Sequence, residues 1–126
     1  ILFAGPVLAE ESRYAVIVNP IRGNDFWAYS HPITETPQKQ YGVISENHLS
    51  ATWLLRFDAL TSPDIVSLLH TFDGKQDIGL FFEITPTLTK AAGVSYNESS
   101  NWHDAKAIFL IGYSRPRSLM DKTAPA

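Results

Sequence analysis

The chain has 126 residues, 44% of them hydrophobic and 18% charged, a composition typical of one globular domain with a single core. Its formal net charge of −3 provides no basic surface, so we predict no nucleic-acid partner. It has no cysteine, which excludes disulfides, thiolate-bound zinc and thiol catalysis.

Residues 1–9 are apolar, and Val7 and Ala9 match the −3 and −1 positions of a signal-peptidase pattern. Nine residues are too few to span a bilayer, so we predict no membrane span here. Residues 1–13 are therefore the remnant of a bacterial-type export signal, a flexible arm or a packed first segment, and residues 14–126 form the domain. The export alternative predicts a secreted or cell-envelope protein.

The first predicted strand covers residues 14–19, a nearly continuous apolar run of the kind that is covered on both faces. Pro20 has no N–H to donate, so we predict that the strand ends there. Residues 21–37 lack a period and read as a long loop, with Trp27 and Tyr29 packed against the domain.

Helix and strand patterns then alternate. The predicted elements are a helix over 38–47, a strand over 51–57, a helix over 62–71, a strand over 77–82 and a short helix over 87–92. Ile65, Leu68, Leu69 and Phe72 give the third of these a buried stripe at helical spacing. This order predicts an α/β fold with a mostly parallel sheet.

The C-terminal third has weaker patterns. Residues 94–104 are polar and read as irregular, and residues 107–111 are an apolar run that is either a fourth strand or a buried loop. Residues 114–122 read as a helix that Ser114 caps, with Pro116 in its first turn.

Two acids, Asp58 and Glu83, lie at or near the carboxyl ends of the second and third predicted strands. The chemistry of parallel α/β folds is concentrated at this edge of the sheet. Paired carboxylates can divide acid and base roles between them, or hold a divalent metal ion. The alternative is that each acid caps a helix or forms an ion pair with Arg56.

Other candidate residues lie at the same edge of the sheet or combine an aromatic ring with a polar group. Asn19 and Arg22 leave the first strand at this edge, where Arg22 is either a ligand for a carboxylate or phosphate or an ordinary surface residue. Trp102 and His103, beside an acid, suit sugar stacking with a proton-transfer group, or else anchor a loop. Trp27 is a second candidate sugar platform. No histidine spacing typical of a metal site occurs, and no nucleotide-binding motif, so we predict neither a metal nor a cofactor.

Three segments resemble the polysaccharide deacetylase (NodB-like) superfamily of glycoside hydrolase/deacetylase barrels. Ala51-Thr-Trp-Leu54 resembles the family's Ala-Thr-Phe-Phe strand, and residues 77–86 resemble the strand with Glu-Ile-Gly-Asn-His-Thr-x-x-His-Pro. Residues 112–121 resemble the Ser-x-Glu-Glu-Arg helix that often follows. The resemblance implies the N-terminal portion of a (β/α) barrel and a carbohydrate ligand.

The departures from that family concern its chemistry. Its two metal-binding histidines would fall at Phe81 and Thr85, and its aspartate pair would fall near Asn19 and Pro20. None of these residues can bind zinc in that way or act as the base, so metal-dependent deacetylation is disfavoured. The family's barrel also continues for several more strands, which predicts an open sheet edge that further strands or an oligomer would cover.

Three hypotheses follow. In the first, the protein is a hydrolase that acts on polysaccharide, with Asp58 and Glu83 as an acid/base pair assisted by His103. In the second, it is a non-catalytic relative that binds glycan or a partner protein at the same edge. In the third, it is an unrelated flavodoxin-like fragment whose aromatic loops only pack.

Overall fold

The structure of the protein is a computed structural model that describes residues 5, 11–25, 30–96 and 102–123. Its elements are β1 (Val18–Ile21), α1 (Glu35–Glu46), β2 (Ala51–Leu55), α2 (Phe57–Leu60), α3 (Pro63–Leu69), β3 (Gln76–Leu80), α4 (Pro86–Ala91) and α5 (Trp102–Thr123). The prediction of an α/β fold is confirmed.

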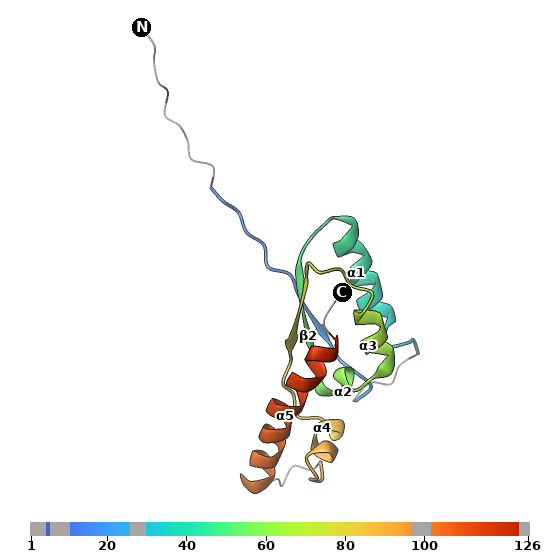
Figure 1. Ribbon diagram of the computed structural model, residues 1–126, viewed down its shortest axis with the longest axis vertical. Helices are drawn as coiled ribbons and strands as arrows, with labels where there is room; N and C mark the ends of the chain where they lie inside the picture. The colour runs from blue at the N-terminus through green and yellow to red at the C-terminus, as the bar shows by residue number, and fades with distance from the viewer. Residues whose placement is uncertain (1–4, 6–10, 26–29, 97–101, 124–126) are drawn as a thin grey trace.

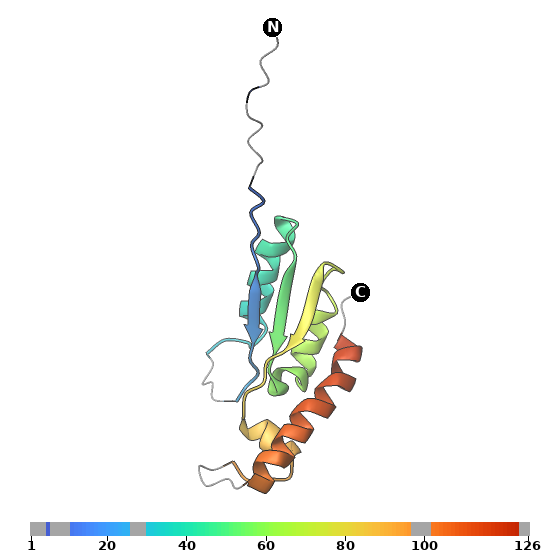
Figure 2. The same ribbon diagram turned by 90° about the vertical axis from the view of Figure 1, so that its left-hand side faces the viewer.

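The three strands form one parallel sheet in the order β1-β2-β3. The helices α1 and α3 lie on the same face of this sheet, and the other face has no helix over it in the described part of the chain (Figures 1 and 2). Figure 2 views the sheet from that open face, with α5 lying beside β3. Within the described residues, the sheet is therefore covered by helices on one face, its β1 edge is free, and α5 lies beside its β3 edge.

The main core fills the space between the sheet and α1 and α3. Trp53 and Leu55 of β2 are fully buried there, and Ile65 and Leu69 of α3 confirm the stripe predicted at helical spacing. Phe72 stacks on Tyr41 of α1 with a ring separation of 4.0 Å. The indole of Trp53 donates to Gln76 Oε1 at 3.2 Å, so the central strand also carries a satisfied polar group.

A second, smaller core joins α2, α4 and α5 below the sheet. Phe57, Leu88 and Ile108 are its buried residues. Gly112 of α5 approaches the ring of Phe82 so closely that a Cβ atom there would overlap it. This cluster holds α5 against the rest of the domain.

The first strand differs from its prediction. It begins at Val18 instead of residue 14, and it continues through Pro20 to Ile21. Thr52 N–H bonds to Ile17 C=O and Arg56 N–H to Ile21 C=O, so alternate residues from Ile17 point their backbone groups toward β2. Pro20 falls between these residues, so its backbone nitrogen faces the free edge of the sheet. Proline is tolerated there, because its missing N–H breaks no hydrogen bond to β2.

The second strand also ends earlier than predicted, at Leu55, and Asp58 lies in the first turn of α2. The C-terminal third is helical: α5 replaces both the predicted irregular segment from Trp102 onward and the predicted fourth strand or buried loop. The reason is a helical period, because Ile108 is buried and Ile111 half-buried while Phe109 is exposed. Ser114 lies inside this helix, where its hydroxyl donates to Leu110 C=O at 2.7 Å instead of capping a helix start.

The remaining element predictions hold within a few residues. The helix α1 begins three residues before its predicted start, and α3 and β3 occupy their predicted places. Thr85 caps α4 through a hydrogen bond from Leu88 N–H, and Gly93 follows with a φ of +75°.

The signal-peptidase pattern at Val7 and Ala9 lies outside the described residues. No helix in the described part of the chain is long and apolar enough to cross a membrane.

Candidate functional site

The carboxyl ends of the three parallel strands meet at one edge of the sheet, and charged side chains follow each of them. Arg22 comes directly after β1, Arg56 directly after β2, and Glu83 three residues after β3. Asp25 lies in the segment after β1, and Asp58 lies in α2. We call these five residues the edge cluster.

Arg56 is the centre of the edge cluster. Its side chain is only 1% exposed, yet it donates four hydrogen bonds within the cluster. Two go to Asp58, from Nε at 2.7 Å and Nη2 at 2.8 Å, which is a bidentate arrangement. Nη1 donates to Glu83 Oε2 at 2.9 Å, and Nη2 also donates to Asp25 C=O at 2.7 Å. One guanidinium thus joins the segments that follow all three strands.

Asp58 is the buried partner of this guanidinium. Besides the two bonds from Arg56, it accepts the N–H of Asp25 at 2.9 Å and that of Ala59 at 3.1 Å. Burial alone raises the pKa of Asp58, but the hydrogen bonds from Arg56 and from the backbone of Asp25 and Gly23 outweigh it and hold the pKa below its ordinary value. The same bond raises the pKa of Arg56, so the pair is charged. Asp58 therefore forms the ion pair with Arg56 that the sequence offered as an alternative.

Asp25 ties the edge cluster to α4. Its carboxylate accepts the Thr87 N–H at 2.8 Å through Oδ2 and the Thr87 hydroxyl at 2.8 Å through Oδ1. The helix α4 has no acid in its own first turn, so Asp25 supplies the negative charge from 62 residues away in sequence. Sequence reasoning missed Asp25, because no local pattern marks a capping group that belongs to another segment.

Glu83 and Arg22 form the accessible part of the edge cluster. Each side chain is 38% exposed, and Arg22 Nε lies 3.6 Å from Glu83 Oε2. The Arg22 guanidinium also lies over the ring of Phe81, 5.2 Å from its centre, within the range of a cation–π contact. A ligand at this edge would meet these three side chains before it met Arg56 or Asp58.

The other predicted site residues do not join the edge cluster. Asn19 lies within β1, where its Nδ2 atom is inaccessible to solvent and has no hydrogen-bond partner among the described residues. His103 is exposed in the first turn of α5, and Trp102 is the first residue of that helix. Trp27 lies outside the described residues, as does Tyr29. The described residues contain no group of histidines or acids arranged to hold a metal ion.

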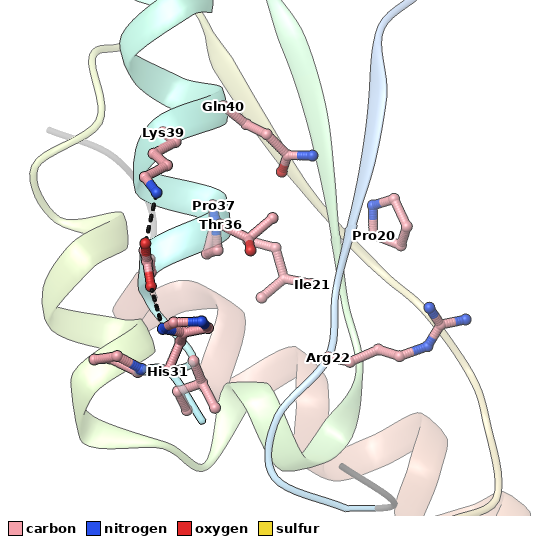
Figure 3. Close-up of a pocket in the computed structure, with 11 residues that line it drawn as sticks. Pro20, Ile21, Arg22, His31, Thr36, Pro37, Lys39 and Gln40 are labelled. Atoms are coloured by element: carbon pink, nitrogen blue, oxygen red, sulfur yellow. Dashed lines mark hydrogen bonds and ion pairs between the residues drawn. The ribbon is translucent and has the colours of Figure 1, made fainter. Parts of the chain in front are cut away.

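A groove of about 530 Å³ runs between the free edge of β1 and α1 (Figure 3). Glu35 lines it with its partners His31, at 3.5 Å, and Lys39. The hydrogen bond from Lys39 lowers the pKa of Glu35. Figure 3 shows the Arg22 side chain directed away from α1, so the backbone of Arg22 belongs to this groove and its guanidinium to the edge cluster.

Comparison with protein-family models, with curated proteins and with solved structures gives no match. The resemblance to the deacetylase barrels consequently rests on the short motifs of the sequence.

Proposed function

We propose that this protein is a non-catalytic, carbohydrate-binding relative of the deacetylase barrels, with Glu83, Arg22 and Phe81 as its ligand-contacting surface. The observation that carries the proposal is the difference in burial and hydrogen bonding between Asp58 and Glu83. Asp58 is buried with both oxygens bonded, whereas Glu83 is partly exposed beside the Arg22 guanidinium, which itself lies over the Phe81 ring. The surface suits binding, and the acid pair does not suit proton transfer.

Acid–base chemistry would require Asp58 to exchange protons with a ligand. Its carboxylate accepts four hydrogen bonds, and its lowered pKa keeps it ionised at neutral pH. A general acid needs the opposite shift, toward the working pH. Glu83 alone remains as an accessible acid, and one carboxylate does not make the pair that glycoside hydrolysis uses.

The topology supports the proposed relation to a (β/α) barrel. Three parallel strands in sequential order, with α1 and α3 on one face, match the repeating unit of such a barrel. A doubly wound sheet reverses its strand order and places helices on both faces. In a barrel, the open face of this sheet would point inward, and the edge cluster would lie at the end where barrels bind their ligands.

Export, proposed from Val7 and Ala9, would bring such a domain to polysaccharide outside the cell or in the cell envelope.

Binding is tested by nuclear magnetic resonance titration of the labelled protein with cellohexaose, xylohexaose and chitohexaose. We expect at least one of them to shift the backbone signals of residues 22, 81 and 83. Replacing Phe81→Leu removes the ring but keeps an apolar side chain, and it should weaken binding by about three- to tenfold. Phe109→Leu changes an exposed phenylalanine on α5 and serves as the matched control.

The same samples test for turnover. We expect neither reducing ends nor acetate to be released. Release that Glu83→Gln abolishes would replace the proposal with the hydrolase hypothesis, and the failure of all three oligosaccharides to bind would refute carbohydrate binding itself.

A further inference from the structure

The carboxylate oxygens of the edge cluster are almost all engaged. Both oxygens of Asp25 accept from Thr87, and both oxygens of Asp58 accept from Arg56 and from backbone N–H groups. Glu83 Oε2 accepts from Arg56. Among the described residues, no donor reaches Glu83 Oε1. A partly exposed carboxylate at the edge of the sheet therefore keeps one strong acceptor for a ligand.

A donor lies beside this acceptor. Arg22 Nε lies 3.6 Å from Glu83 Oε2, and the terminal Nη groups of Arg22 form no hydrogen bond with the described residues. The side chain is held in place by the Phe81 ring beneath it. The acceptor on Glu83 and the donor on Arg22 thus lie side by side, and the buried Arg56 holds Glu83 through its hydrogen bond.

The charge of the edge cluster restricts what can bind. It contains two guanidinium groups and three carboxylates, so its formal net charge is −1. Both arginines already face carboxylates of the protein itself. An anionic ligand would have to displace Glu83 or accept its repulsion, whereas a neutral ligand meets no such cost.

We propose that Glu83 and Arg22 form a subsite for two neighbouring hydroxyl groups of a neutral sugar, and that the subsite discriminates against acidic sugars. A hydroxyl can both donate and accept, so one hydroxyl donates to Glu83 Oε1 while its neighbour accepts from an Nη group of Arg22. This inference rests on the proposed carbohydrate binding and specifies which sugars the edge takes.

Three probes that share one ring separate these features. Methyl β-glucoside has neighbouring ring hydroxyls, its 3-deoxy analogue has lost every such pair, and methyl β-glucuronide keeps them but adds a carboxylate. Titrations followed at residues 22, 81 and 83 should give the glucoside the highest affinity. We expect each of the other two probes to bind at least about threefold more weakly.

Variants then assign the roles. Glu83→Gln keeps an acceptor without the charge, so it should weaken glucoside binding and strengthen glucuronide binding. Arg22→Met removes the donor and should weaken both. Glu46→Gln, an exposed acid at the far end of α1, is the matched control and should change neither.

The outcomes distinguish this inference from the function on which it rests. Tighter binding of the glucuronide, or equal binding of the deoxy analogue, at the edge of the sheet would overturn the subsite and leave carbohydrate binding intact. An unchanged preference in Glu83→Gln would also overturn it. If neither these probes nor the hexaoses bind, the proposed function fails together with the subsite.

Discussion

A buried arginine is costly unless each of its donors meets an acceptor, and Arg56 meets this condition through residues from three segments. The arrangement is asymmetric in its consequences. Removal of either member of the Arg56–Asp58 pair leaves the other as an uncompensated buried charge. The two residues therefore stabilise the fold only when both are present. Loss of either one should lower the stability of the fold before it affects the binding of any ligand.

Arg56→Met should destabilise the fold by about 3–5 kcal/mol, because Asp58 would keep its charge without its buried partner. Urea denaturation followed by circular dichroism measures the change. Arg13→Met, in the exposed segment before β1, is the matched control and should leave the unfolding midpoint unchanged. A loss below about 1 kcal/mol in Arg56→Met would mean that water reaches Asp58.

The same pair should give the protein an acid-sensitive stability. The folded pKa of Asp58 lies below its unfolded value of about 3.9, so the stabilisation is present above that pH and is lost as the pH falls toward the folded pKa. Asp58→Asn removes this titration, and its free energy of unfolding should fall less steeply than that of the wild type below about pH 4. Parallel slopes for the two proteins between pH 5 and pH 2 would contradict the assignment.

At the scale of the elements, α5 depends on one close approach. Gly112 leaves no space between the helix backbone and the Phe82 ring, while the buried Ile108 lies one turn earlier on the same helix. A glycine is unfavourable inside a helix, so its presence there is explained by packing and not by propensity.

Gly112→Ala should therefore destabilise the protein by about 1–3 kcal/mol, despite the better helix propensity of alanine. Gly42→Ala, inside α1 with open space around it, is the matched control and should stabilise by up to about 1 kcal/mol. Thermal unfolding of the two variants measures the contrast. Equal stabilisation of both would show that Phe82 moves aside without cost.

The described part of the molecule has a two-layer architecture, in which one face of the sheet and its β1 edge have no helix or strand against them. The apolar side chains Val16 and Val18 are 84% and 48% exposed beside that face. Such a sheet invites pairing with another chain. Pro20 opposes this on β1, because it removes a backbone donor from the free edge.

Pro20→Val should restore that donor and promote self-association without weakening the fold, since Pro20 donates nothing to β2. Sedimentation velocity over a range of concentrations should show an increased sedimentation coefficient for the variant. Pro63→Ala, at the exposed start of α3, is the matched control and should behave as the wild type does. If Pro20→Val also sediments as the wild type does, the edge is protected by something other than the proline.

The elements were predictable where their signals are local. The buried stripe through Ile65 and Leu69 and the start of α4 at Thr85 and Pro86 follow from residues that lie within a few positions of one another. The errors came from ambiguous runs: the apolar residues of 107–111 fit a strand as well as a helix until a packing partner decides.

The sequence by itself determined that the chain is α/β with parallel strands, and that acids stand near the ends of two of them, since chain order and periodicity are local properties. Tertiary structure alone decided the burial and the partners of those acids. Arg56 meets Glu83 and Asp25 across separations of 27 and 31 residues. Only the folding of three segments onto one edge buries Asp58 and leaves Glu83 partly exposed. A charge takes its role from its solvation and its partners, and both are fixed by contacts that the linear chain does not contain.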